Sequence, residues 1–200
     1  MRLRKYHPHQ SVLFVTFSVE EGLLLLANPL CLTLVKSALS AAQELYPVII
    51  SHFIVQATHL HLLMVVDDPE DVRNFIRYFK TESAHLINRL LGRRKRTIWC
   101  EGYDSPVVLT PEKALSVIAY FYANPAKDNL TETIDLFPGL SSWKMFQRKT
   151  YSKVWKRIRR PAVRALPHHS SRAYTDEAQR LLKDSSSKHT FSIQPNAWLS

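Results

Sequence analysis

The chain has 200 residues, of which 46% are hydrophobic, and this composition excludes an intrinsically disordered protein because a sizeable core can be buried. Its two cysteines exclude a disulfide framework and a zinc knuckle, and they fit a reducing compartment. The net charge of +10 predicts an anionic partner, with nucleic acid ahead of an anionic membrane surface.

The N-terminal region resembles a secretory signal only superficially. Glu20 and Glu21 interrupt its apolar run, and no small-residue cleavage site follows cleanly. The apolar stretch 23–27 is far too short to span a bilayer. We therefore expect a cytoplasmic protein without a membrane partner.

The first strands and the first helix are predicted from local patterns. Residues 11–19 form an apolar run typical of a strand. A helix is predicted to follow Asn28, a good N-cap, with Pro29 as its first residue. Residues 48–56 and 60–66 predict two antiparallel strands joined by a tight connection.

The same pairing of a cap residue with a proline starts two further helices. One begins at Asp68-Pro69 and the other at Thr110-Pro111, and residues 103–109 between them are predicted to form a fourth strand. The element order is therefore βαββαβ followed by a helix. This order predicts an α+β fold with the ferredoxin-like arrangement, in which the third strand is central in the sheet.

His61 lies inside the segment predicted as the third strand, and His59 directly precedes that segment, with Leu60 between the two histidines. Because side chains alternate between the faces of a strand, both imidazoles are expected to point the same way. Two imidazoles one pleat apart can hold a divalent metal with open coordination positions. The alternative is a pair of hydrogen-bonded structural histidines on a half-buried sheet.

The last helix carries a polar stripe with Tyr120 and Asn124, which are four residues apart and hence neighbours on its surface. Tyr122 is rotated by about 200° from Tyr120, toward the apolar side, where it is expected to pack. Pro125 is predicted to end the helix directly after Asn124. Tyr120 could simply pack on the sheet, but a helix across the histidine face would bring phenol, amide and imidazoles to one point.

Four motifs, in this order, resemble those of the single-tyrosine HUH endonucleases, and most closely those of the REP-associated tyrosine transposases. They are His59-Leu60-His61, Trp99 with Tyr103-Asp104, Tyr120-Phe121-Tyr122-Ala123-Asn124-Pro125, and Phe137-Pro138 with Ser141-Ser142. Each motif alone is weak, but their order and spacing together are specific. The resemblance predicts a transposase domain at residues 5–146 and a basic C-terminal extension at residues 147–200.

Two segments depart from the family pattern. Gln56-Ala57-Thr58 stands where the family usually has Met-Pro-Asn before the first histidine. Ala126-Lys127-Asp128-Asn129 stands where the family commonly has Val-Arg-Ala-Gly. Neither departure removes the histidine pair, the tyrosine or the asparagine.

The resemblance implies an HUH-type fold and a metal-dependent endonuclease and strand transferase. By the family pattern, Tyr120 is the nucleophile, and His59, His61 and Asn124 bind Mg²⁺ or Mn²⁺. The substrate implied is single-stranded or hairpin (REP-like) DNA, which is cleaved and rejoined through a covalent 5′-phosphotyrosine. Relatives include swapped homodimers and monomers, and a bacterial, nucleoid-associated protein is expected.

Positive charge is concentrated after the second predicted helix and in the C-terminal extension. No acidic residue occurs at 136–175, and aromatic residues are interleaved with the cations, which favours nucleic-acid contact over a merely solvated face. The residues predicted to contact DNA are Lys113, Lys127, Arg93, Arg94, Lys95, Arg96, Lys153, Lys156, Arg157, Arg159 and Arg160.

Two other functions fit parts of the sequence. A catalytically silent, domesticated protein that binds DNA hairpins would share the fold, but drift is expected to remove at least one of the four site residues. An RNA-binding ferredoxin-like module would need exposed aromatic residues in an RNP pattern on its central strands, and the third strand lacks them.

Overall fold

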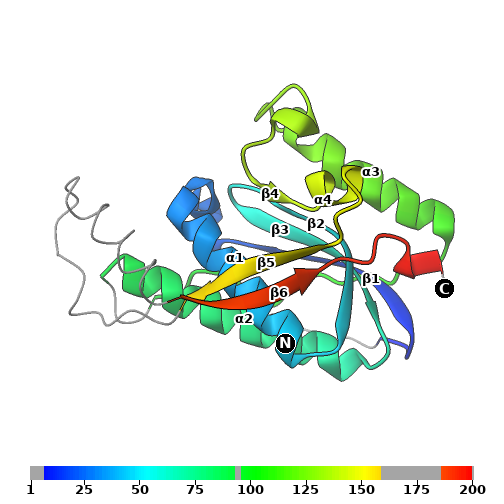
Figure 1. Ribbon diagram of the computed structural model, residues 1–200, viewed down its shortest axis with the longest axis horizontal. Helices are drawn as coiled ribbons and strands as arrows, with labels where there is room; N and C mark the ends of the chain where they lie inside the picture. Colours follow the sequence, from blue (N-terminus) through cyan, green and yellow to red (C-terminus); the bar gives the residue numbers. More distant parts are fainter. Residues whose placement is uncertain (1–6, 93–95, 159–185, 200) are drawn as a thin grey trace.

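The computed structural model describes residues 7–92, 96–158 and 186–199. It is an α+β fold built on a four-stranded antiparallel sheet of order β1-β3-β2-β4 (Figure 1). The strands are β1 (Ser11–Ser18), β2 (Val48–Val55), β3 (His59–Val66), β4 (Leu140–Ser141), β5 (Ser152–Ile158) and β6 (Ser186–Ser192). The helices are α1 (Pro29–Leu45), α2 (Pro69–Leu90), α3 (Pro111–Lys127) and α4 (Trp143–Gln147).

The prediction of three capped helix starts is confirmed. Asn28 accepts a hydrogen bond from the Leu30 backbone N–H at 2.8 Å, and Asp68 accepts one from the Glu70 N–H at 2.8 Å. Thr110 caps α3 in the same way, and a proline follows each of the three caps. Each cap satisfies a backbone donor that the first helical turn would leave unpaired.

The end of α3 differs from the prediction, because the helix passes through Pro125 and ends at Lys127. A proline lacks one backbone donor, and in the last turn that loss removes only a single hydrogen bond. The Asp128 N–H still donates to the Asn124 carbonyl at 2.9 Å. The polar stripe of α3 therefore continues one turn further than expected.

The predicted fourth strand at 103–109 is wrong as a regular strand. Residues 98–108 run beside β1 but pair with it only at isolated bridges, which join Val19 to Trp99, Thr16 to Asp104 and Leu13 to Val107. Pro106 has no N–H to donate, and Gly102 has a φ of +72°, so a continuous ladder is interrupted. The segment nevertheless takes the edge position of the fourth strand in the ferredoxin-like order.

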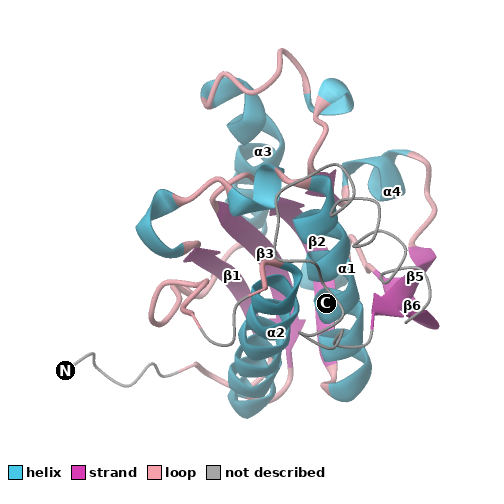
Figure 2. Ribbon diagram, turned by 90° about the vertical axis from the view of Figure 1, so that its left-hand side faces the viewer, coloured by secondary structure: helices cyan, strands magenta, loops and turns pink. Residues whose placement is uncertain are grey.

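The two faces of the sheet are covered by different helices. Helices α1 and α2 pack together on one face, and α3 covers the other (Figures 1 and 2). In β3, Leu60 and Leu62 belong to the main core under α1 and α2, whereas Leu63 belongs to the smaller core under α3. Alternation along the strand then puts His59 and His61 on the α3 side.

The C-terminal region returns to the core as a two-stranded antiparallel sheet of β5 and β6, which packs against α1 (Figure 1). The Trp155 ring stacks on the Phe191 ring with 4.0 Å between centroids, and Phe191 meets Phe53 edge-to-face at 5.5 Å. This β5–β6 sheet lies on the α1 side of the main four-stranded sheet.

Among the described residues, no helix is long and apolar enough to cross a membrane.

Candidate active site

His59 and His61 lie side by side beneath α3, with 4.6 Å between their ring centroids. His61 is buried and stacks on Phe121 of α3, with an interplanar angle of 14°. The central position of β3 fixes both histidines, because β3 is paired on both edges, to β1 and to β2. The imidazoles therefore stand on a strand that is hydrogen-bonded to a neighbour on each side.

Asn124 reaches the same point from α3. Its side-chain nitrogen Nδ2 lies 3.4 Å from Nε2 of His59 and 3.5 Å from Nε2 of His61. The amide is buried, and a half-turn about its last side-chain bond would put the oxygen where the nitrogen stands. Two imidazole nitrogens and one amide therefore converge, and this donor set suits Mn²⁺, or Mg²⁺ with several retained waters.

The protonation of the two histidines also suits a metal. Burial lowers the pKa of His61 to about 3, with the neighbouring His59 as the second cause, and burial lowers the pKa of His59 as well. Both rings are thus neutral at neutral pH, which is the form that binds a cation. Nδ1 of His59 lies 2.9 Å from the Thr58 hydroxyl, and when that nitrogen carries the proton, the Nε2 lone pair faces Asn124.

Within the described residues, no group of three or more His, Cys, Asp or Glu side chains is placed to hold a metal ion. The set formed by His59, His61 and Asn124 is of another kind, because it contains two histidines and a neutral amide. None of these three side chains is negatively charged, and the carboxylate that acts electrostatically on His59 is that of Asp128, just beyond the end of α3.

Tyr120 lies on the same side of the sheet as the histidines. Its ring centroid is 5.5 Å from that of His61, and its ring also meets Phe14 edge-to-face at 6.3 Å. The side chain is 37% exposed, so a substrate can reach it. Lys127, one turn beyond Asn124, places its ammonium 5.5 Å from the Tyr120 ring centroid.

Tyr122 points away from this site into the protein. Its hydroxyl lies 2.6 Å from Nδ1 of His52 and 3.0 Å from the Ser142 hydroxyl. Ser142 in turn accepts a hydrogen bond from the Phe53 N–H at 2.8 Å. Burial raises the pKa of Tyr122 well above its ordinary value, which keeps the phenol protonated. Tyr122 is therefore a structural residue that ties α3 to β2.

Replacing Tyr122 by Phe is expected to lower the free energy of unfolding by about 1–3 kcal/mol, because His52 and Ser142 then lose a buried hydrogen-bond partner. Urea unfolding of the variant measures this. The matched control is Tyr120→Phe on the more exposed side of the same helix, expected to change the free energy by less than about 0.5 kcal/mol. Equal values for the two variants would contradict the assignment.

The predicted DNA-contacting residues do not gather at one place. Lys127 lies at the site, whereas Lys113 lies at the other end of α3, about 20 Å away along the helix axis. The cations of β5 and β6 are on the α1 side of the main sheet: Lys153, Lys156 and Lys188 are exposed, and Arg157 is half-buried. Arg96 is exposed, and Arg93, Arg94, Lys95, Arg159 and Arg160 lie outside the described residues.

One polar residue at the site was missed by the sequence reasoning. The Oε1 atom of Gln56 accepts a hydrogen bond from Nδ2 of Asn124 at 2.9 Å. In the sequence Gln56 stood out only as a departure from the family pattern. Its signal was a glutamine at the end of an otherwise apolar strand, but no spacing rule links it to a residue 68 positions further along.

The sequence matches the family described as "Transposase IS200 like" over residues 25–124, which is half of the chain. The matched range begins before α1 and ends at Asn124, so it contains both histidines and Tyr120. Among curated proteins, none has a sequence that matches this chain.

Solved structures of transposases are among those that align with this one. A REP-associated tyrosine transposase, whose structure is bound to a REP hairpin, aligns with a TM-score of 0.59 at 17% identity, covering 76% of this chain and 88% of that chain. A putative transposase from Deinococcus radiodurans aligns with a TM-score of 0.44 at 13% identity, covering 60% and 95%. The first likeness confirms the fold, and the family match identifies the lineage: this chain belongs to the IS200-like transposase family.

Proposed function

We propose that this protein is a metal-dependent endonuclease and strand transferase that cleaves and rejoins hairpin DNA through a covalent bond to Tyr120. The observation that carries the proposal is the convergence of two imidazoles and one amide within 3.5 Å, with an accessible tyrosine ring 5.5 Å from His61. The substrate class rests on the family match and on the hairpin bound by the structural relative.

His59, His61 and Asn124 would hold Mg²⁺ or Mn²⁺ through Nε2, Nε2 and the amide oxygen. The bound cation would supply Lewis-acid polarisation of the scissile phosphate. The residues themselves supply the geometry: β3 fixes the imidazoles, and α3 fixes the amide and the nucleophile on one rigid helix. Lys127, with its ammonium over the Tyr120 ring, is placed to contact the phosphate that Tyr120 attacks.

The chemical step is an in-line displacement at phosphorus. The Tyr120 phenol loses its proton and its oxygen forms a bond to phosphorus, while the bond from phosphorus to the 3′ oxygen breaks. The 3′ oxygen takes up one proton and leaves as a 3′-hydroxyl, so the number of protons balances. The product is a 5′-phosphotyrosine. Attack by another 3′-hydroxyl reverses the step and joins two strands, so the energy of the broken bond is conserved and no ATP is required.

A catalytically silent hairpin-binding protein is the competing function. It needs neither an accessible phenol nor a converging set of donor atoms. Here Tyr120 remains 37% exposed beside the histidines, and the three proposed ligands are all in place. These observations support the enzyme.

The basic side chains of β5 are proposed to add sequence-independent affinity for DNA phosphates. Replacing Lys153, Lys156 and Arg157 together by Ala should make the slope of log K against log salt shallower by about 2 on single strands, at roughly 0.7 for each phosphate that these cations neutralise. Fluorescence anisotropy over a salt series measures the slope. An unchanged slope would mean that these cations are only solvated.

The control for this measurement removes cations that already have partners. Arg73 is paired with Glu70, and Arg77 donates a hydrogen bond to Asn74 at 2.9 Å, both within α2. Replacing these two arginines by Ala should leave the salt slope unchanged. An equal change of slope in both variants would mean that the net charge of the protein, and not the surface of β5, determines the salt dependence.

The proposed activity itself is tested with labelled single-stranded hairpins taken from the repeats that flank the gene. With Mn²⁺ present, the full chain should form a DNA adduct that survives denaturing electrophoresis, and cleavage should release a free 3′-hydroxyl. If hairpins are bound tightly and no adduct or cleavage appears with either metal, the silent binding protein is the correct function.

A further inference from the structure

Gln56 lies between β2 and β3, directly beneath Asn124. It is buried, at 2% exposure, and its oxygen Oε1 accepts a hydrogen bond from Nδ2 of Asn124 at 2.9 Å. Its own side-chain nitrogen, Nε2, is also buried and has no hydrogen-bond partner among the described residues. One half of the Gln56 amide is therefore committed to Asn124, and the other half is unsatisfied.

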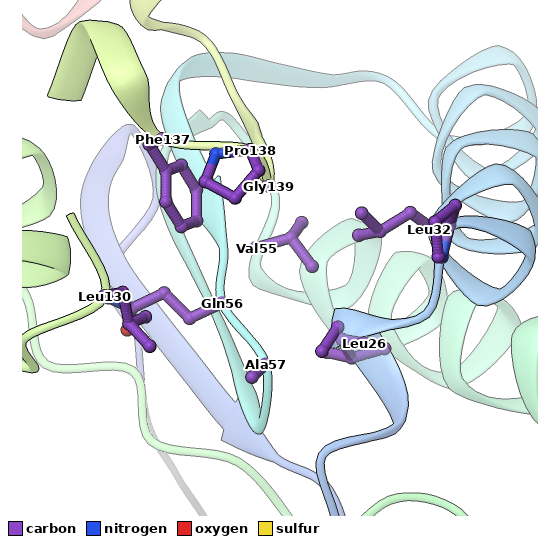
Figure 3. A pocket seen from close by; sticks show the side chains of 11 residues that line it. Leu26, Leu32, Val55, Gln56, Ala57, Leu130, Phe137, Pro138 and Gly139 are labelled. Carbon is purple, nitrogen blue, oxygen red and sulfur yellow. The ribbon is translucent and has the colours of Figure 1, made fainter.

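The surroundings of Gln56 are mostly apolar. Residues 55–57 form the wall of a pocket of about 240 Å³, with Leu26 and Leu32 on one side and Leu130 and Phe137 on the other (Figure 3). An apolar side chain would pack here without an unpaired polar atom, whereas a buried amide with an unsatisfied donor is destabilising. Packing therefore does not explain a glutamine at this position, and its contact with Asn124 remains as the reason.

Asn124 needs help because its amide can face the histidines in two ways. With Nδ2 toward them, as here, it donates toward neutral imidazole nitrogens; as a metal ligand it has to present its oxygen instead. Only a neighbour that both accepts and donates can pair with either orientation. An amide does so: Gln56 accepts from Asn124 through Oε1 in the first state and, after a half-turn of its own amide, can donate through Nε2 in the second.

We propose that Gln56 is a positioning residue for the metal site: its amide orients that of Asn124 and thereby strengthens the binding of a divalent cation by His59, His61 and Asn124. The inference rests on the proposed function, because it assumes that these three residues hold the metal. Residues that orient metal ligands typically change metal affinity by about 10–100-fold when they are replaced.

The test is Gln56→Met in the full chain, with Mn²⁺ binding followed by electron paramagnetic resonance of the free ion. Methionine has a similar length and suits the apolar pocket. We expect Mn²⁺ affinity to fall about 10–100-fold. The melting temperature of the metal-free protein should change little, because removal of the unsatisfied Nε2 offsets the loss of the acceptor for Nδ2 of Asn124.

The matched control is Gln43→Met, the same substitution at a structural glutamine. Gln43 donates to the Ser192 carbonyl at 2.8 Å and accepts from the Ser192 N–H at 2.9 Å, which ties α1 to β6. Its replacement should lower the melting temperature and leave Mn²⁺ affinity unchanged. The two glutamines should thus give opposite results in the two measurements.

A measurement on the unmodified protein supplies a second arm. On saturation with Mg²⁺, the side-chain NH₂ signals of Gln56 and Asn124 should shift together in nitrogen–proton spectra. Shifts at Asn124 alone, or an Mn²⁺ affinity of Gln56→Met within about twofold of the unmodified protein, would overturn the role of Gln56 while leaving the endonuclease proposal standing. Failure of the unmodified protein to bind Mn²⁺ at all would overturn both.

Discussion

Tyr120→Phe should abolish DNA cleavage while leaving the fold and hairpin binding intact. The change removes one oxygen atom from a side chain that is 37% exposed, so packing is little affected. Without the hydroxyl of the proposed nucleophile, the covalent bond to phosphorus cannot form at this residue, and cleavage should fall by at least about 10⁴-fold. Single-turnover cleavage of a labelled hairpin measures the rate, and anisotropy measures binding.

The control for this prediction is Tyr122→Phe. Tyr122 is two residues away on the same helix, but its hydroxyl is hydrogen-bonded to His52 and Ser142 on the buried side. The Tyr122→Phe variant should therefore still cleave DNA at temperatures where it is folded. Undiminished cleavage by Tyr120→Phe would show that another group attacks the phosphate.

Replacing His59 or His61 by Ala should also abolish cleavage and leave hairpin binding in place, because the cations proposed to bind the DNA backbone lie mainly elsewhere. Each change removes one of the two proposed nitrogen ligands, which stand 3.4 and 3.5 Å from Nδ2 of Asn124, and should thereby weaken metal binding. Asn124→Ala should be milder, since an amide oxygen is the weakest of the three ligands. Cleavage with Mn²⁺ and Mn²⁺ affinity should fall together across these variants.

A third buried histidine controls for the damage that any such change does to the core. His52 is bonded to Tyr122 on the same face of the sheet but does not reach the site. His52→Ala should therefore lower stability without changing Mn²⁺ affinity. Full cleavage by the unmodified protein in EDTA would remove metal from the mechanism altogether.

Much of the site could be predicted because it depends on the regular spacing of side chains along one strand and one helix. Alternation along β3 puts His59 and His61 on one face, and helical spacing puts Tyr120 and Asn124 on one stripe. The element order then predicts that α3 lies across the central strand, since the cap-and-proline starts fix where each helix begins. The roles of these residues stay predictions until they are tested.

The rest depended on contacts between distant parts of the chain. Gln56 meets Asn124 across 68 positions, and nothing local marks that pair. The sequence does not indicate on which side of the main sheet the cations of β5 lie. The pairing of β5 with β6 and the stack of Trp155 on Phe191 hold β5 on the α1 side. Residues 98–108 likewise lie beside β1 through isolated bridges and do not form a regular strand.

The most direct test of the central claim is peptide mapping of the trapped covalent adduct. The full chain is incubated with a labelled hairpin and Mn²⁺, denatured and digested, and the DNA-bearing peptide is sequenced by mass spectrometry. The geometry beside His61 predicts that the phosphate is found on Tyr120. Recovery of the adduct on Tyr122 or Tyr103 would contradict this account.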